Sequence, residues 1–385
     1  MIAPRAQPPG HVVVTENGDD QVMANLVGKR AAIVSYRLGT ADGVSVAAAQ
    51  WAGALQRLGM RVRTVAGDGD PDVQVPGLAL DSARPPSQRA LSTALDDADI
   101  VIADNVCSLP MNIAAGEAVA QYLRGRPAVL RHHDLPWERD RYADITTWPP
   151  DDPEWRHVTV NDLARRALGA RRGIAATTIY HGFSEERRPE ARQPTRAAVG
   201  VGAELLVLQP TRAIPRKNVD GGLAIAEALG ATFWLTGPAE DGYADELVRL
   251  LGRARVPVRR RLPDGVDMAA AYAACDAVVL PSSWEGFGLP VIEAALHRKP
   301  IAVADFPVAA ELRAFGFRWF PADDPAQLGA WLADPDPALL DHNEKIAEEH
   351  FGIDALARRL DELLTGAPAL HQAATAANGS LNATA

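Results

Sequence analysis

The feature that most constrains the fold is an alternation of short apolar runs with longer segments of helical spacing, and it occurs twice. The first series opens with the strand-like run 31–36 and the helical pattern 43–59, and the second restarts near residue 204. Short strands joined by helices predict parallel sheets covered by helices on both faces. The sequence therefore predicts an α/β protein with two doubly wound, Rossmann-like domains. A cleft should lie between the carboxyl ends of their sheets, where such folds bind ligands.

Composition sets the predicted domain boundaries. The chain has 385 residues, enough for two domains of about 150–200 residues each. The segment between the two series is rich in charge and proline, and both ends of the chain are rich in small, polar or Pro/Gly residues. We predict a flexible lead at 1–24, an N-terminal domain at 25–185, a linker at 186–203, a C-terminal domain at 204–340, a C-terminal helix at 341–365 that packs back towards the N-terminal domain, and a disordered tail at 366–385.

Charge and cysteine content exclude several classes of protein. A net charge of −10 argues against general binding to nucleic acid or anionic membranes, although a local basic site for a phosphorylated ligand remains possible. The two cysteines, Cys107 and Cys275, do not suggest a disulfide framework or a thiolate metal site. No apolar run reaches the roughly 18 residues that span a bilayer, and 1–20 lack a signal-peptide pattern. We expect a cytoplasmic protein without integral membrane association.

The segment 281–293, PSSWEGFGLPVIE, places two carboxylates eight positions apart around a glycine-rich turn. An apolar strand precedes this turn, and Pro290 suits the first turn of a following helix. Glycines allow the backbone to approach a ligand closely, and the free amides at a helix start attract anions. Glu285 and Glu293 can then bind hydroxyl groups on either side of the phosphates. Taken alone, Glu293 is equally well explained as an acid favoured near a helix N-terminus.

This segment resembles the EX7E motif of retaining nucleotide-sugar glycosyltransferases with the GT-B fold, specifically glycosyltransferase family 4. The resemblance covers roughly residues 30–365. It implies that Glu285 contacts the donor sugar and that Glu293 binds the ribose. It also implies that the N-terminal domain binds the acceptor and the C-terminal domain the nucleotide sugar. The donor-binding residues of the turn would be Gly286, Phe287, Gly288 and Leu289.

A second motif lies in LLVLQPTRAIPRKNVDGG, which follows the first strand of the C-terminal domain. Arg212 and Lys217 can reach a diphosphate there, the one as a rigid fork and the other as a mobile point charge. Their spacing is similar to the phosphate-binding pair of the family, which makes both candidate catalytic residues. The alternative is a solvated basic loop, and we interpret Arg216 as a solvated neighbour.

In the N-terminal half, VLRHHDLPWERDR places His132, His133 and Asp134 at the carboxyl end of a strand. The family often has a His-Asp pair here whose histidine contacts the donor sugar and the reacting region. By this resemblance, His133 is a candidate catalytic residue. His132 is the fallback, and it joins Asp134 as a candidate for acceptor binding. A lone histidine is more often structural.

Other polar residues at strand ends complete the expected site. Gly43 in the turn SYRLGTADGVS is expected to approach the donor, and Asp42 beside it the acceptor. Asn105 and Asn161 can contact the acceptor, but capping helices explains them equally well. The Asp-x-Asp patterns at 68–70 and 97–99 lack supporting partners or lie on the wrong side of the sheet. We therefore expect no metal and no other cofactor.

The predicted function is that of a retaining, metal-independent glycosyltransferase. The resemblance implies front-face attack, with the leaving phosphate accepting the proton of the acceptor. TADGVSVAAAQW, RHHDLPWERDR and WPPDDPEWRHVTVN resemble bacterial members that modify small soluble acceptors, such as glucosylglycerate-type compounds, with GDP-mannose. The donor hexose can be linked to GDP or UDP. Two alternatives stay open, a nucleotide-sugar 2-epimerase of the same fold and a non-catalytic nucleotide-sugar-binding or scaffold protein.

Overall fold

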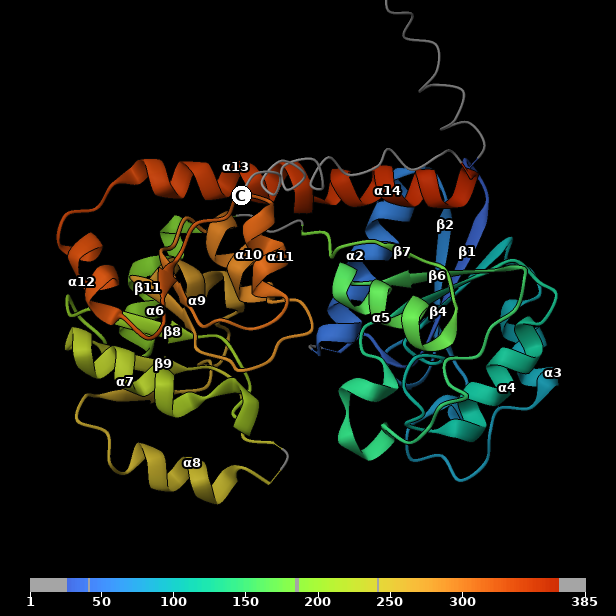
Figure 1. Ribbon diagram of the computed structural model, residues 1–385, viewed down its shortest axis with the longest axis horizontal. Coiled ribbons are helices and arrows are strands. Elements are labelled where there is room, and N and C mark those ends of the chain that lie inside the picture. The colour runs from blue at the N-terminus through green and yellow to red at the C-terminus, as the bar shows by residue number, and fades with distance from the viewer. Residues whose placement is uncertain (1–25, 41, 184–186, 241, 367–385) are drawn as a thin grey trace, which may run out of the picture.

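The computed structural model describes residues 26–40, 42–183, 187–240 and 242–366, and these form two α/β domains side by side (Figure 1). The N-terminal sheet has the order β3-β2-β1-β4-β5-β6-β7. Its strands are β1 (Arg30–Leu38), β2 (Arg61–Gly69), β3 (Val73–Gln74), β4 (Ile100–Asp104), β5 (Ala128–His132), β6 (Trp155–Thr159) and β7 (Ala176–Thr178). The C-terminal sheet has the order β10-β9-β8-β11-β12-β13. Its strands are β8 (Leu206–Gln209), β9 (Thr232–Leu235), β10 (Val258–Arg260), β11 (Ala277–Leu280), β12 (Ile301–Val303) and β13 (Phe320–Pro321).

Helices connect these strands and cover both faces of each sheet. The N-terminal domain contains α2 (Gly43–Arg57), η1 (Pro76–Leu78), α3 (Gln88–Leu95), α4 (Ile113–Leu123), η2 (Pro136–Glu138), η3 (Asp140–Tyr142) and α5 (Asp162–Arg172). The rest of the chain contains η4 (Pro189–Ala191), α6 (Arg192–Ala198), η5 (Pro215–Lys217), α7 (Val219–Leu229), α8 (Ala244–Leu251), α9 (Met268–Ala274), α10 (Leu289–Leu296), α11 (Ala309–Ala314), α12 (Pro325–Ala333), α13 (Pro337–Phe351) and α14 (Ile353–Thr365).

All strand pairs are parallel, which confirms the predicted fold class of two doubly wound domains. The central strands are buried on both faces, as the almost continuously buried β1 illustrates. The strand order reverses between β1 and β4 in one sheet and between β8 and β11 in the other. Loops leave the sheet in opposite directions at such a point and open a crevice. The functional site is therefore expected beyond the ends of these four strands.

The C-terminal helices α13 and α14 bridge the two domains. Helix α13 packs on α10 of the C-terminal domain, and α14 packs on α2 of the N-terminal domain (Figure 1). Gly352 separates the two helices, and a Cβ there would lie only 2.6 Å from the Glu348 carbonyl oxygen. Phe183 flanks this break, because its N–H donates to Phe351 O and its own carbonyl accepts from Ile353 N. The predicted tails, 1–24 and 366–385, lie outside the described residues except for Gly366.

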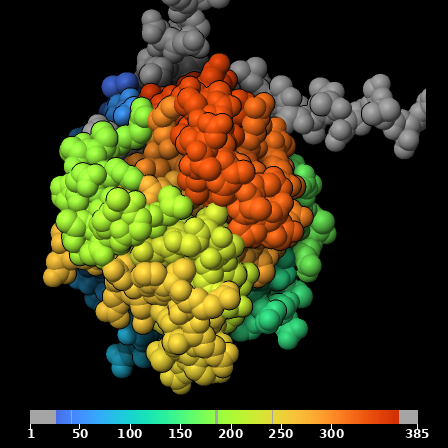
Figure 2. All heavy atoms as spheres, turned by 90° about the vertical axis from the view of Figure 1, so that its left-hand side faces the viewer, coloured from blue at the N-terminus to red at the C-terminus, as the bar shows by residue number. Residues whose placement is uncertain are grey.

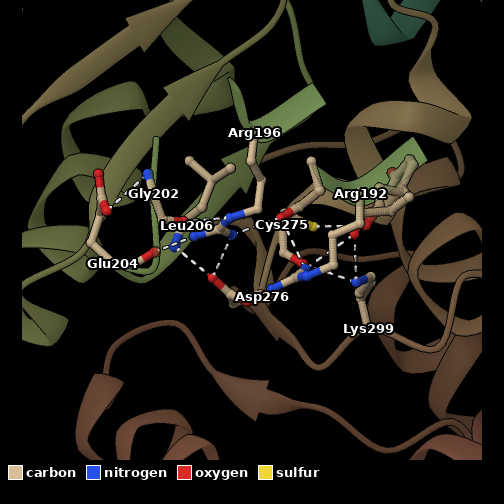
Figure 3. Close-up of polar contacts among 11 residues, drawn as sticks. Arg192, Arg196, Gly202, Glu204, Leu206, Cys275, Asp276 and Lys299 are labelled. Carbon is tan, nitrogen blue, oxygen red and sulfur yellow. Dashed lines mark hydrogen bonds and ion pairs between the residues drawn. The ribbon is translucent and has the colours of Figure 1, made fainter. Parts of the chain in front are cut away.

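The predicted linker, 186–203, contains structure of its own that belongs to the C-terminal domain. Its η4 and α6 pack against α9, and this light-green segment lies on the C-terminal domain in Figure 2. The guanidinium of Arg192 donates to the carbonyls that end α9, and both Arg192 and Arg196 pair with Asp276 (Figure 3). Lys299 donates to two of the same carbonyls. The positive charges compensate the negative end of α9 and anchor η4 and α6 on the C-terminal domain.

Candidate active site

A cleft of about 1070 Å³ lies between the two domains, at the strand ends where the topology predicts a ligand site. Residues from both domains line it. It brings together most of the predicted site residues, namely Asp42, Gly43, Asn105, His133, Asp134, Arg212, Lys217, Glu285, Gly286, Phe287, Gly288, Leu289 and Glu293. Two predicted residues, His132 and Asn161, are not among those that line it.

The glycine-rich turn connects the end of β11 to the start of α10, as predicted. Gly288 is the N-cap of α10 and has a φ of 95°, a conformation that residues with a side chain rarely adopt. Pro290 lies in the first turn of the helix and provides no N–H, so it loses no helical hydrogen bond there. The turn therefore delivers Glu285 to the cleft from a fixed backbone, next to a helix N-terminus that favours anions.

The carboxylate of Glu285 is bound by Lys217 across the C-terminal wall of the cleft. The Lys217 Nζ lies 2.6 Å from Oε1 and 2.5 Å from Oε2 of Glu285, and both side chains are nearly buried. Burial lowers the pKa of Lys217, and the charge of Glu285 opposes this shift. Breaking such a buried pair leaves each charge uncompensated unless another group takes the place of the lost partner. A ligand that displaces either side chain here must therefore be polar or charged.

Two arginines flank this pair, and their positions differ from the prediction. Arg212 lines the cleft but remains half exposed and pairs with Glu240 at 2.7 Å. Arg216, which we interpreted as a solvated neighbour, lines the cleft as well. Its guanidinium is mostly buried, donates to Trp284 O and lies 3.9 Å from Glu285. That interpretation was wrong, because Pro215 starts the short helix η5 and turns Arg216 and Lys217 together toward Glu285.

Glu293 lies just beyond the first turn of α10 and is anchored from a neighbouring helix. The hydroxyl of Tyr272 donates to its Oε2 at 2.5 Å, and the Tyr272 ring is stacked on His297. The two predicted glutamates therefore reach the same cleft from the turn and from the helix that follows it. The stretch between them comprises the rest of the glycine-rich loop after Glu285 and the first turn of α10 before Glu293.

On the N-terminal wall, the central group is a buried charge network around Asp104. Asp104 is fully buried; its Oδ1 lies 2.7 Å from His133 Nε2 and its Oδ2 lies 3.3 Å from Arg131 Nη1. Burial favours the neutral acid, but Arg131 and then His133 hold the pKa of Asp104 below its usual value. Because a carboxylate only accepts, His133 donates through Nε2 and turns Nδ1 away from Asp104. The network thus fixes which nitrogen of His133 is available for other contacts.

Comparison with known proteins shows similarity to glycosyltransferases. Residues 214–333 match the family of group 1 glycosyl transferases. The chain is 22% identical to the mannosylglucosylglycerate synthase of Thermotoga maritima, over 87% of this chain and 99% of that protein. It is 24% identical to the enzyme of the same name from Petrotoga mobilis, over 72% and 82% of the two chains.

Solved structures agree on the fold. The crystal structure of Anabaena Alr3699/HepE in complex with UDP-glucose is similar, with a TM-score of 0.66, 19% sequence identity and coverage of 88% of this chain and 99% of that chain. WaaG, a glycosyltransferase involved in lipopolysaccharide biosynthesis, gives a TM-score of 0.58 at 16% identity, over 87% and 100% of the chains. The chain is a glycosyltransferase with the GT-B fold.

Within this glycosyltransferase, His132 lies in the protein interior instead of the cleft. Its side chain is 1% exposed, with Nδ1 lying 2.7 Å from Ser108 Oγ and Nε2 2.9 Å from His157 Nδ1. Burial, followed by the neighbouring histidines, holds the pKa of His132 well below its usual value. His132 is the last residue of β5 and His133 follows the strand, and the two rings have different partners, Ser108 and His157 for His132 and Asp104 for His133. Both predictions for His132, as the fallback for His133 and as a contact to the acceptor, are therefore wrong, and His133 is the histidine that lines the cleft.

Of the two predicted asparagines, Asn105 lines the cleft and Asn161 does not. Asn161 caps α5, because its Oδ1 accepts from Ala164 N at 2.6 Å. Asn105 lines the cleft, is 4% exposed and has a φ of 63°, which is uncommon for a residue with a side chain. Its Oδ1 is buried without a hydrogen-bond partner among the described residues. A polar atom of this kind has unused capacity for a ligand hydrogen bond.

Asp42, Gly43 and Asp134 lie at the cleft with partners of their own. Asp42 caps α2 by accepting from Val44 N and Ser45 N, and it lies 3.4 Å from Arg37. Asp134 is paired with Arg139 at 2.9 Å. Asp42, which we predicted to approach the acceptor, thus caps α2 and lines the cleft at the same time.

Sequence reasoning missed Asp104, Arg131 and His181, which hold His133 in place. Arg131 Nη2 lies 3.2 Å from His181 Nδ1, and the rings of His133 and His181 are 5.5 Å apart. Asp104 ends β4 immediately before Asn105, and His181 follows β7. Both therefore lie near the carboxyl ends of strands, where the other site residues were predicted. The available signal was a charged residue in an otherwise apolar strand, since Asp104 and Arg131 each interrupt such a run.

The described residues also bear on metals and membranes. Among them, no group of three or more His, Cys, Asp or Glu side chains is arranged to hold a metal ion. In the same part of the chain, no helix combines the length and apolar character needed to cross a bilayer.

Proposed function

We propose that the protein transfers a hexose from a nucleoside-diphosphate sugar, linked to GDP or UDP, to a small soluble acceptor, with retention of the anomeric configuration and without a metal. The observation that carries the proposal is the buried contact between Lys217 and Glu285 at the glycine-rich turn. It supplies a cation for a diphosphate and a carboxylate for sugar hydroxyls within one hydrogen bond of each other. The resemblance to family 4 and its EX7E motif supports the same assignment.

In the proposed reaction, the diphosphate lies at the start of α10 and faces Lys217, Arg212 and Arg216. Negative charge grows on the diphosphate as the bond to the sugar breaks, and prearranged cations stabilise that charge. Glu285 binds hydroxyls of the transferred sugar once Lys217 moves to the phosphate. Glu293, held by Tyr272, binds the ribose. The acceptor attacks from the side of the leaving phosphate, which takes the proton of the acceptor.

The N-terminal wall then binds the acceptor and the exposed face of the sugar. His133 is oriented by Asp104, and Asn105 offers its unpartnered Oδ1. Arg141 lines the cleft from η3, is stacked on Tyr142 and has no acid partner among the described residues. The names of the Thermotoga and Petrotoga relatives contain glycerate, a carboxylate. We therefore propose that the acceptor carries an anionic group that pairs with Arg141.

The test is a thermal-shift series with UDP, GDP, ADP and their sugar conjugates. One nucleotide should raise the melting temperature, since a ligand at about 100 times its Kd adds roughly 2.7 kcal/mol of stability. Glu293→Ala should weaken that stabilisation, whereas Glu349→Ala, which removes an exposed glutamate of α13, should not. The absence of a shift with every nucleotide at millimolar concentration would contradict the proposal and favour a scaffold role.

Product analysis separates transfer from isomerisation. The nucleotide sugar that binds is incubated with and without glycerate-containing acceptors, and the products are resolved by NMR. Transfer requires an acceptor and yields a product whose anomeric configuration matches the donor. Conversion of the donor to its 2-epimer without an acceptor would identify the epimerase, and an inverted product would contradict retention.

A further inference from the structure

The N-terminal end of α5 contacts the C-terminal domain directly at the donor-side turn. The Asn161 Nδ2 donates to the carbonyl oxygen of Gly286 at 2.5 Å. The next amide, Asp162 N, donates to Glu311 Oε1 at 2.7 Å, and Glu311 lies in α11. Two consecutive residues of one domain thus hold two separate elements of the other.

A capping role alone does not require asparagine at this position. Serine and aspartate cap helices as well as asparagine does. The side chain of Asn161 performs both tasks, because Oδ1 accepts from Ala164 N while Nδ2 donates to Gly286. Among capping side chains, an uncharged amide alone combines an acceptor with an NH₂ donor. The choice of residue therefore points to the interdomain contact.

The carbonyl that Asn161 binds belongs to the turn that carries Glu285. Gly286 packs against the N-terminal domain, and a Cβ there would lie at an ordinary contact distance of 3.7 Å from His133 O. Phe287, on its other side, is buried with its ring centroid 5.1 Å from that of His181 and 5.9 Å from that of Tyr180. The backbone of the turn is thus held from the opposite domain at consecutive residues.

Glu311 provides a second tie beside the first. Its Oε1 also accepts from the Tyr180 hydroxyl at 2.5 Å. A carboxylate at the N-terminus of α5 is favoured by the helix dipole, although it comes from the other domain. We name these contacts the interdomain latch. It consists of the hydrogen bond from Asn161 to Gly286 and those from Asp162 and Tyr180 to Glu311. Each of them breaks when the domains separate.

We propose that Asn161 is a positioning residue that couples closure of the two domains to the placement of the donor-binding turn. When the latch is closed, the amide of Asn161 fixes Gly286, and Glu285 is held in the cleft opposite His133. When the latch is open, the turn has lost its support. The inference rests on the proposed function in treating this turn as the donor site.

The experiment compares two substitutions at Asn161 with a matched control. Asn161→Asp keeps a cap for α5 but replaces the donor with a carboxylate, and Asn161→Ser keeps a cap without adding charge. The control is Asn112→Asp in α4, where Asn112 also caps a helix through Oδ1 and donates through Nδ2, here to Ala79 O. Hydrogen exchange of peptides that span 284–292 is measured together with kcat and the donor KM.

Both Asn161 variants should exchange roughly tenfold faster across 284–292, because one hydrogen bond of about 1.4 kcal/mol is lost. Exchange within α5 should stay as in the wild type. The kcat should fall about tenfold while the donor KM changes less than about twofold, because the latch acts on the closed arrangement. The Asn112 variant should leave exchange in the turn and kcat unchanged.

Unchanged exchange of the turn in both Asn161 variants would overturn the proposal, whether or not a transfer reaction has been found. Faster exchange spread through the whole of α5 would overturn it too, since Asn161 would then only stabilise the helix. If the donor KM rose by the same factor as kcat fell, the turn would depend on Asn161 in both the open and the closed arrangement of the domains. That result would contradict the proposed coupling to domain closure. If the proposed function fails, the wild-type enzyme turns over no nucleotide sugar, and the exchange measurement still decides on the latch.

Discussion

On the C-terminal wall of the cleft, Lys217 and Glu285 come from two loops that follow the neighbouring strands β8 and β11. On the N-terminal wall, Asp104, Arg131 and His181 come from three strand ends and form a network around His133. The first arrangement is one ion pair at a turn, whose partners can be exchanged for a ligand. The second is a closed set of buried partners that hold a single ring. The comparison indicates that the C-terminal wall can rearrange when a charged ligand binds, whereas the N-terminal wall holds His133 in a fixed position. We refer to them as the responsive wall and the rigid wall.

The largest loss of activity is expected on the responsive wall. Lys217→Ala should lower kcat by about 10²–10³-fold, the range observed when one preorganised group that stabilises developing negative charge is removed. Lys299→Ala is the matched control, because Lys299 is also largely buried in the C-terminal domain but donates to the carbonyls of Ala273 and Cys275. Steady-state kinetics per folded enzyme check the difference. Equal losses in the two variants would mean that Lys217 acts only through the fold.

The rigid wall should instead show a large loss of stability. Asp104→Asn leaves Arg131 buried without its carboxylate, and breaking such a pair costs about 3–5 kcal/mol of unfolding free energy. Asp276→Asn removes an aspartate that pairs with Arg192 and Arg196 outside the cleft. Both variants should unfold at lower urea concentration. Only the Asp104 variant should also lose kcat per folded enzyme, because His133 loses the partner that orients it; a normal kcat there would show that the network serves stability alone.

The same carboxylate predicts a pH dependence. The pKa of Asp104 in the folded protein lies below its usual value, because Arg131 and His133 outweigh the effect of burial. A lowered pKa means that the charged form contributes stability above the pKa of the unfolded chain, near 4, and that this contribution is lost as the pH falls through the folded value. In urea melts between pH 6 and pH 3, the free energy of unfolding should therefore fall more steeply for the wild type than for the Asp104→Asn variant. Parallel curves would remove Asp104 from the acid-sensitive groups.

The difference between the walls also explains how much could be predicted from the sequence. The alternation of strands and helices gave the two domains and the cleft, because parallel sheets constrain where loops meet. Glu285, Glu293 and Lys217 lie in short segments whose spacing is itself the signal. Asp104 and Arg131 are far apart along the chain and meet only because β4 and β5 are neighbours in the sheet. Such a network depends on strand order and register, which the sequence pattern did not fix.

For the same reason, the sequence could not distinguish side chains that lie next to each other. His132 ends β5 and lies in the interior, whereas His133 follows the strand and lines the cleft. Arg216 was misjudged because the direction of a loop residue depends on the short helix η5. For Asn161, the sequence left acceptor contact and helix capping open, and it gave no sign of the second partner, Gly286, which lies 125 residues away. Long-range contacts of this kind come from the packing of the two domains.

The smallest effect is expected for alanine at Gly43, a substitution that tests whether a substrate occupies the space beside the start of α2. A Cβ on Gly43 would have no heavy atom of the described residues within 4 Å, and the same is true of Gly53 in the same helix α2. Neither glycine has a positive φ, so alanine strains neither backbone. Both variants should be as stable as the wild type or about 0.4–1 kcal/mol more stable, because alanine restricts the unfolded chain.

Their kinetics should differ, because Gly43 lines the cleft and Gly53 does not. In Gly43→Ala, the added methyl group occupies space that the substrates need. Overpacking of about 1 kcal/mol corresponds to a rise in KM of roughly fivefold for the substrate that contacts α2. Gly53→Ala should leave both KM values unchanged. Measuring KM for donor and acceptor separately then assigns the start of α2 to one of them, and unchanged values for both would place bound substrate away from this end of the helix.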